Sequence, residues 1–231
     1  MPYYYMDYWY LVLVVPALLL SVWAQIRVKT TFAKYSRLTV GRGMTGEQVS
    51  RYIQQCGGIQ VAVKPVAGSL TDHYDPRDNT ISLSAEVYDR STVAAIGVAA
   101  HETGHALQHA EGYSPVKWRT NLVPITNFAT GISPILVVLG IVMAMEPLAY
   151  VGIALFSLSV VFHLVTLPVE FNASARAVAA LEGSGQFSEE ELQGVRRVLS
   201  AAALTYVAAT LVSLMNLLRL VLLVSGRGRD D

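Results

Sequence analysis

The sequence predicts a mainly α-helical membrane protein, with about four transmembrane helices and a small α+β portion at the membrane face. Of its 231 residues, 53% are hydrophobic and only 15% are charged, and the mean hydropathy of +0.42 is high for a soluble domain. Several apolar runs approach the roughly 20 residues that cross a bilayer. One polar portion, residues 27–121, interrupts these runs, and we expect a single membrane-embedded domain over residues 1–231.

Charge and cysteine content exclude some classes of partner. The chain carries 17 basic and 17 acidic residues, a formal net charge of zero, which gives no electrostatic basis for binding nucleic acid. Its one cysteine, Cys56, can form no internal disulfide and fits a reducing compartment. We expect the Cys56 side chain to be a small buried hydrophobe.

The first apolar run, residues 8–24, predicts an anchor helix. Tyrosines before it are typical of an interfacial aromatic belt, and Gln25, Arg27 and Lys29 follow it. A signal peptide carries positive charge before its apolar core, whereas Asp7 is the charged residue here. We therefore expect an anchor that is not cleaved.

The polar portion begins with helix and strand patterns. Thr45-Gly46-Glu47-Gln48 matches a capping box and predicts a helix that ends at Gly57-Gly58. Residues 60–66 and 79–84 alternate between apolar and polar side chains and predict two strands of a β-hairpin over 59–84. Two interpretations stay open: strand 79–84 is a rim on which an extended substrate pairs its backbone, or the hairpin is purely structural.

The next predicted helix, over residues 92–110, carries an H-E-x-x-H motif. Residues four apart share one helix face, so His101 and His105 can offer two imidazoles to one zinc ion, with Glu102 beside them. Two such ligands and a carboxylate that takes a proton from water are the pattern of zinc hydrolases. Ser91 is the predicted N-cap of this helix.

His109 lies on the same predicted face, two turns beyond His101. The intervening residues rise about 12 Å, whereas zinc–nitrogen bonds are about 2 Å long. His109 therefore cannot complete the same site without a chain reversal. We interpret it as a residue near the ligands or the substrate, or as an ordinary surface histidine.

Three more apolar runs predict membrane helices after the motif. Residues 125–167 form a predicted helical hairpin whose turn lies at Glu146-Pro147. A last apolar helix is predicted over 198–224. Because that segment contains Asn216 and Arg219, it is less typical of a simple span.

The positions of lysine and arginine predict the orientation. Segment 25–124 holds eleven of them and segment 168–199 holds three, whereas the N-terminus and the 146–147 turn hold none. Both basic segments, and the motif helix with them, should face the cytoplasm. Arg227 and Arg229 would lie on the opposite side if the last run spans, which is a second argument against that span.

A catalytic zinc site takes three protein ligands and keeps a fourth position for water. Glu170 is the candidate third ligand, because it follows Pro168 at the start of a predicted helix over 168–182, on the same side of the membrane as the two histidines. Asn172 and Ser174 could orient the ligands through hydrogen bonds. The competing ligands are Asp72, His73 and His163.

Five longer motifs occur in one order along the chain: Trp23-Ala24-Gln25, Leu70–Pro76, His101–Gln108, Leu167–Ser174 and Ala201–Ala209. In these motifs the chain resembles the YugP-type membrane zinc proteases, also called neutral zinc metallopeptidases, over nearly its whole length. The resemblance implies a bacterial integral membrane protein with a gluzincin-like site. In that site Glu170 completes the zinc coordination by His101 and His105.

We therefore expect a multi-pass plasma-membrane zinc metallopeptidase, with a zincin-like catalytic portion. It would hydrolyse peptide bonds of membrane-associated or misfolded proteins, with Zn²⁺ as cofactor, Glu102 as general base, and protein substrate and lipid bilayer as partners. Tyr206 or His109 could stabilise the oxyanion. The alternatives are a membrane protein with a structural zinc site, and a zinc amidase or lipid-modifying hydrolase.

Overall fold

The computed structural model describes residues 7–227, which form two compact units. Within the described residues, the helical unit is drawn from 7–24, 118–167 and 205–227, and the site unit from Gln25–Lys117 and Pro168–Leu204. Each unit is described by itself below. The expectation of one membrane-embedded domain stays a prediction.

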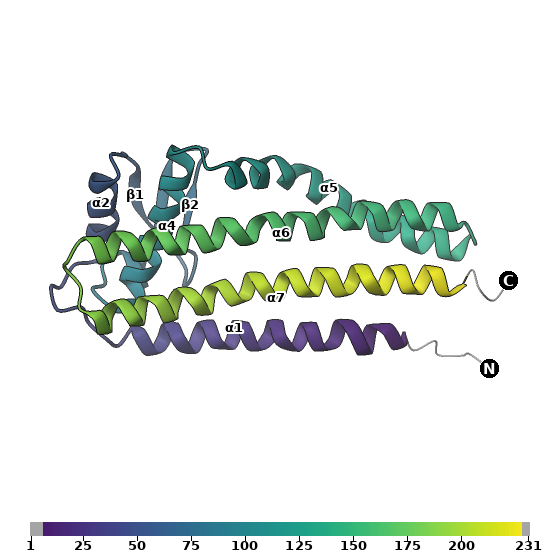
Figure 1. Cartoon of the computed structure of the whole chain (residues 1–231), viewed down its shortest axis with the longest axis horizontal. Coiled ribbons are helices and arrows are strands. Elements are labelled where there is room, and N and C mark those ends of the chain that lie inside the picture. The colour runs from purple at the N-terminus through teal and green to yellow at the C-terminus, as the bar shows by residue number, and fades with distance from the viewer. Residues whose placement is uncertain (1–6, 228–231) are drawn as a thin grey trace. The chain divides into compact units, whose positions relative to one another are not determined.

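Four helices of the described chain are long and apolar enough to cross a membrane (Figure 1). They are a π-helical turn, Tyr10–Val14, continued by α1 (Val15–Tyr35), then α5 (Ser114–Val142), α6 (Glu146–Gly183) and α7 (Glu189–Arg227). The other elements are a small sheet and the helices α2 (Gly46–Cys56), α3 (Ala85–Tyr88) and α4 (Val93–Ala110). The predicted class, a mainly α-helical membrane protein with a small α+β portion, is confirmed.

Arg219, which argued against a simple last span, is paired within the helical unit. Its Nε donates to Asp7 Oδ2 at 2.6 Å, and its guanidinium lies 5.2 Å from the ring centre of Tyr10. Asn216 donates to the Val212 carbonyl at 3.0 Å. A paired cation and a bonded amide cost far less in an apolar helix than unpaired ones.

Helix α6 continues without a break through Pro168. The expectation that a new helix begins at Pro168 is therefore wrong, and Glu170 lies inside α6. A proline inside a helix removes one N–H and one backbone bond. Membrane proteins tolerate this where neighbouring groups satisfy the freed carbonyl. The part of α6 after Leu167 belongs to the site unit.

The sheet of the site unit has three strands in the order β1-β3-β2. Strand β1 (Ala62–Val66) is parallel to β3 (Thr80–Ser84), and β2 (His73–Asp75) is antiparallel to β3. A hairpin exists, but β2 and β3 form it, because the segment between β1 and β3 contributes a strand of its own, β2, before the chain reverses. The predicted hairpin of 60–66 with 79–84 is wrong.

This topology also bears on the predicted substrate rim. Ile81, at the centre of β3, pairs with Val63 of β1 on one side and with Tyr74 of β2 on the other. Because both edges of β3 are occupied over residues 80–82, no further strand can add to it there. The interpretation of strand 79–84 as the rim for backbone pairing is therefore wrong for residues 80–82, and for Leu83 and Ser84 it stays a prediction.

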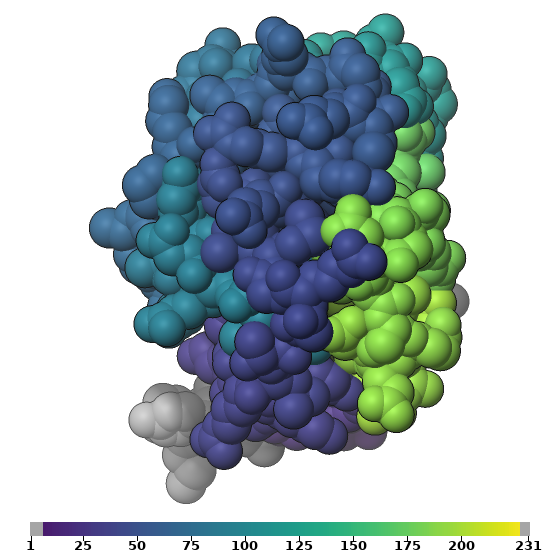
Figure 2. All heavy atoms as spheres, turned by 90° about the vertical axis from the view of Figure 1, so that its left-hand side faces the viewer, coloured from purple at the N-terminus to yellow at the C-terminus, as the bar shows by residue number. Residues whose placement is uncertain are grey.

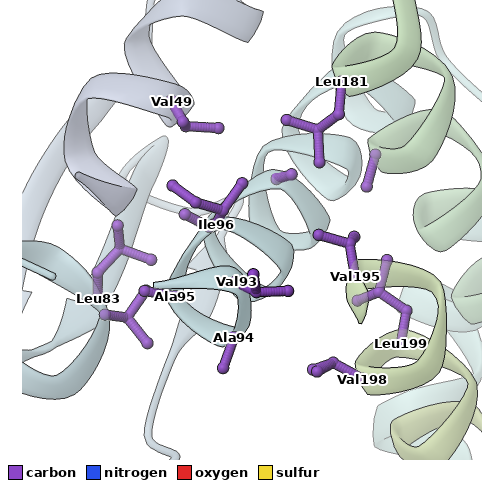
Figure 3. Packing of buried hydrophobic residues seen from close by; sticks show 14 of the residues in the cluster. Val49, Leu83, Val93, Ala94, Ala95, Ile96, Leu181, Val195, Val198 and Leu199 are labelled. Atoms are coloured by element: carbon purple, nitrogen blue, oxygen red, sulfur yellow. The ribbon is translucent and has the colours of Figure 1, made fainter. Parts of the chain in front are cut away.

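Helix α4 lies at the centre of the hydrophobic core. Figure 3 shows Val93, Ala94, Ala95 and Ile96 of α4 surrounded by side chains from the other elements of the site unit. Those labelled are Val49, Leu83, Leu181, Val195, Val198 and Leu199. The alanines at 94, 95, 99 and 100 are all fully buried. Small side chains on several faces of α4 let other elements approach it closely, which fixes the position of its H-E-x-x-H segment.

The start of α4 lies one residue later than predicted. Thr92 is the N-cap and its side chain accepts from the Ala95 N–H at 3.3 Å. The carbonyl of Ser91 instead accepts from the Val40 N–H at 2.9 Å. The prediction of Ser91 as N-cap is wrong, because its backbone pairs with the segment between α1 and α2.

The segment between α1 and α2 also contacts the start of α7. The Gly41 N–H donates to Glu191 Oε1 at 2.7 Å, and Figure 2 shows the dark blue residues before α2 beside the green residues of the α6–α7 connection. The contact joins parts of the chain 150 residues apart.

Helix α2 confirms the capping box. Thr45 accepts from the Gln48 N–H at 3.3 Å, and the Gln48 side chain accepts from the Thr45 N–H at 3.0 Å. The helix ends at Cys56, before the predicted glycines. Cys56 is exposed, so its prediction as a buried hydrophobe is wrong; it occupies the last, outward-facing turn of α2.

Candidate metal centre

His101, His105 and Glu170 converge within the site unit. The Nε2 atoms of the two histidines are 3.1 Å apart, and Glu170 Oε2 lies 3.4 Å from the first and 3.5 Å from the second. The histidine side chains are 14% exposed and Glu170 is 2% exposed. In the described chain, these three residues form a group whose spacing suits a metal ion.

The spacing fits zinc in particular. Four ligands at zinc–nitrogen and zinc–oxygen distances of 2.0–2.2 Å, arranged tetrahedrally, lie about 3.3–3.6 Å from one another. The three measured separations, 3.1, 3.4 and 3.5 Å, are close to this range. Two imidazoles and one carboxylate are also a ligand set found in catalytic zinc sites, where a fourth position stays open.

A chain of hydrogen bonds fixes the orientation of His105. Arg176 can only donate, so the atom of Asn172 that it contacts at 2.7 Å is the carbonyl oxygen. The same oxygen accepts from Gln108 Nε2 at 2.9 Å, and Gln108 Nε2 also donates to the Val169 carbonyl at 2.8 Å. The Gln108 amide oxygen therefore faces His105 Nδ1, at 3.1 Å.

This sequence of donors and acceptors determines the tautomer of His105. Since the Gln108 oxygen can only accept, His105 Nδ1 carries a hydrogen, and Nε2 is the ring nitrogen left to face Glu170, or to bind a metal ion through its lone pair once it is deprotonated. Burial opposes protonation of His105, but the hydrogen bond to Glu170 and the charges of Glu102 and Glu170 outweigh it and raise its pKa. A cation between these groups is thus favoured electrostatically.

His101 is oriented from the other helix. Ser174 Oγ lies 3.1 Å from His101 Nδ1 and can accept its hydrogen, which leaves Nε2 to face His105 and Glu170. Asn172 and Ser174 were predicted to orient the ligands, and the structure places both in hydrogen bonds that lead to them. Ligand histidines in metal sites commonly carry such a partner on the second nitrogen.

Close approach of α4 and α6 brings the three candidate ligands together. A Cβ atom at Gly104 would lie 2.6 Å from the Ala173 carbonyl oxygen, so only glycine fits at position 104 without a shift of the backbone. On its other side, α4 is joined to α2 by the buried hydroxyls of Ser50 and Thr103, 2.8 Å apart.

Glu102 is half-buried beside the converging residues, and among residues 7–227 its carboxylate forms no hydrogen bond or ion pair. Its charge reaches His105 and also Asp72. Burial, with a smaller contribution from Glu102, raises the pKa of Asp72 in spite of its hydrogen bonds from Ser84. Glu102 is thus a carboxylate near the site that forms no hydrogen bond or ion pair with another side chain of the described chain.

The competing ligands have other partners. Asp72 accepts from the Ser84 N–H at 2.7 Å and from its hydroxyl at 3.1 Å, which fixes the end of β3. His73 Nδ1 lies 2.8 Å from the Thr71 carbonyl and the residue is exposed. His163 belongs to the helical unit.

The two residues considered for oxyanion stabilisation are placed as follows. His109 is exposed and its ring centre lies 5.9 Å from that of Tyr74 in β2. Tyr206 belongs to the helical unit, on α7. Their roles stay predictions.

Sequence reasoning missed the roles of Gln108 and Arg176. Gln108 is fully buried on the helix that carries the motif, three residues after His105. A glutamine at that spacing in a run of apolar residues was the available signal. Arg176 is held by Glu111 at 2.7 Å and lies over the Tyr113 ring, contacts that no local pattern indicates.

Known proteins resemble this chain over almost all of its length. A family model described as "Putative neutral zinc metallopeptidase" matches residues 10–225. The chain is 48% identical to "Putative membrane protease YugP" of Bacillus subtilis (strain 168), over 223 residues that cover 96% of this chain and 99% of that protein. No solved structure matches. The chain therefore belongs to the family described as putative neutral zinc metallopeptidases.

Proposed function

We propose that this protein is a zinc-dependent membrane endopeptidase, with His101, His105 and Glu170 as the metal ligands and Glu102 as the general base. The observation that carries the proposal is the convergence of two Nε2 atoms and one carboxylate oxygen at 3.1–3.5 Å. Membership of a zinc metallopeptidase family supports it.

The chemistry follows from the residues around that point. A bound zinc ion would supply the Lewis acidity that polarises a peptide carbonyl and makes water acidic. Glu102 accepts a proton from the attacking water and later gives it to the leaving amine, so that water adds across the C–N bond and the bond breaks. Gln108 and Ser174 hold the imidazoles so that their Nε2 lone pairs stay directed at the ion.

Two features favour a catalytic site over a structural one. Structural zinc sites close all four positions with protein ligands, and among residues 7–227 the converging group has three members. A structural zinc site also gives no role to a carboxylate that lies next to the ligands and forms no hydrogen bond or ion pair with another side chain of the described chain. Glu102 is such a carboxylate.

The substrate class and the orientation belong to the same proposal. Glu170 follows Leu167, the end of an apolar run, by three residues of one helix, or about 4.5 Å of rise. The metal centre thus lies close to a membrane interface, which favours membrane-associated or misfolded proteins as substrates. The distribution of basic residues supports a cytoplasmic interface.

The test is a comparison of the wild type with Glu102→Gln. Each protein is purified in detergent, loaded with zinc and incubated with membrane proteins extracted from a strain that lacks it, and new peptide termini are identified by mass spectrometry. We expect cleavage by the wild type and a loss of at least about 100-fold in Glu102→Gln. The control is Glu190→Gln, an exposed carboxylate at the start of α7.

The outcomes separate the alternatives. Identical peptide profiles for the wild type and Glu102→Gln, with full zinc content in both, would favour a structural zinc site. Loss of a non-peptide hydrolysis product together with an unchanged peptide profile would favour an amidase or a lipid-modifying hydrolase.

A further inference from the structure

A basic cleft of about 430 Å³ lies in the site unit between α1 and α7, apart from the metal centre. Four cationic side chains line it, and no carboxylate of the described residues does so. The cations are Arg27, Lys34, Arg196 and Arg197, with the hydroxyls of Thr31 and Ser200 among them. Its volume is within the range of small-molecule sites.

The four cations are not equally available to a ligand. Arg196 forms ion pairs with Glu182 and, at 2.8 Å, with Glu189, so it is held as part of the wall. Lys34 lies over the ring of Tyr35, at 5.5 Å, and its ammonium forms no ion pair within residues 7–227. Arg197 is exposed and likewise forms no ion pair in that range. Lys34 and Arg197 thus bring uncompensated positive charge to the cleft from two different helices.

The cleft lies where two apolar segments end. Arg27 follows Ala24, the end of the first apolar run, by three residues of the same helix, or about 4.5 Å. Ser200 begins the apolar part of α7. Arg27 and Ser200 therefore lie at the level of lipid headgroups when the helices span, and Lys34 lies about 10 Å beyond Arg27 along α1, on the aqueous side. Basic pockets at the ends of membrane helices are a common form of anionic headgroup site.

We propose that this cleft binds the phosphate group of an anionic glycerophospholipid. Lys34 and Arg197 supply the charge, and Thr31 and Ser200 supply hydroxyl donors to the phosphate oxygens. Basic residues that only set topology need no common cavity, whereas these converge from segments more than 150 residues apart on one concave site. A position at headgroup level favours a lipid over a soluble phosphate ester.

The test uses the full-length protein in a neutral detergent, with native mass spectrometry as the readout. Phosphatidylglycerol, phosphatidylcholine and free glycerol phosphate are titrated separately, and the third is also used as a competitor. We expect the wild type to retain phosphatidylglycerol in preference to phosphatidylcholine. In Lys34→Gln/Arg197→Gln this retention should fall roughly 5- to 30-fold, as expected for removing two cations near an anionic headgroup.

Two further variants keep the result interpretable. Arg37→Gln/Arg42→Gln removes the same charge from exposed positions outside the cleft and should bind like the wild type. Lys34→Arg/Arg197→Lys keeps the charge and should retain most of the binding, and circular dichroism confirms that each variant is folded.

Three outcomes overturn the proposal. They are equal loss in the two charge-removing variants, equal retention of the two lipids by the wild type, and displacement of phosphatidylglycerol by free glycerol phosphate at similar concentration. The last outcome would assign the cleft to a soluble phosphate ester. None of these measurements depends on zinc or on proteolysis, so they separate this proposal from the proposed function.

Discussion

The side-chain amide of Gln108 donates to the carbonyl oxygen of Val169 at 2.8 Å. This bond joins the helix that carries the H-E-x-x-H motif to the residue directly before Glu170. The same amide accepts from His105. One buried glutamine thus links the orientation of a candidate ligand in α4 to the position of the third candidate ligand in α6.

Replacement of Gln108 by alanine tests this link. We expect Gln108→Ala to bind zinc about 10- to 100-fold more weakly, because His105 loses the acceptor that fixes its tautomer, and to lose about 1–3 kcal/mol of folding stability. Competition with a chromophoric chelator measures the affinity, and thermal unfolding measures the stability. Gln55→Ala, at an exposed position of α2, is the control. An unchanged zinc affinity in Gln108→Ala would contradict the assigned role.

Metal content tests the three candidate ligands. Replacing His101, His105 or Glu170 by alanine should remove most of the bound zinc, because three ligands are the minimum of a catalytic zinc site. Glu102→Gln should keep it, since Glu102 is not among the converging atoms. Elemental analysis of the purified proteins gives the zinc per chain. Full zinc occupancy in Glu170→Ala would reject Glu170 and return Asp72 or His73 as the third ligand.

The close packing at Gly104 predicts an effect on stability. Gly104→Ala places a methyl group 2.6 Å from the Ala173 carbonyl oxygen, and backbone must shift to accommodate it. We expect a loss of about 1–3 kcal/mol together with weaker zinc binding, because α4 and α6 move apart. Gly183→Ala, whose new Cβ meets no atom within 4 Å, should leave both properties unchanged. Equal unfolding temperatures for the two variants would show that α4 and α6 can separate without cost.

Labelling of cysteines tests the orientation. Cys56 is exposed, so a Cys56→Ser background is needed first. In that background Asp89→Cys, at an exposed position of the site unit, should resist a membrane-impermeant thiol reagent in intact cells and react after lysis. Met145→Cys, at the exposed turn between α5 and α6, should react in intact cells. The reverse pattern would place the candidate metal centre outside the cytoplasm.

The sequence by itself determined those features that depend on neighbouring residues. The capping box at Thr45 formed because its partner lies three residues away, and the i, i+4 spacing placed His101 and His105 on one face because of the period of the helix. The apolar runs likewise predicted the four candidate spans, since bilayer thickness alone sets their length. Each of these results needs no knowledge of any distant segment.

Tertiary structure decided what depends on contacts between distant residues. Alternation predicted strands β1 and β3, but the pairing of β1 parallel to β3, with β2 on the other edge, depended on the path of the chain between them. The hydrogen-bond partners of Gln108 lie 61 and 64 residues away along the chain. Likewise, α4 and α6 pack closely where Gly104 contacts Ala173, a residue of a distant segment. Periodicity shows which face of a helix is apolar, but only the packed core selects the segment that covers it.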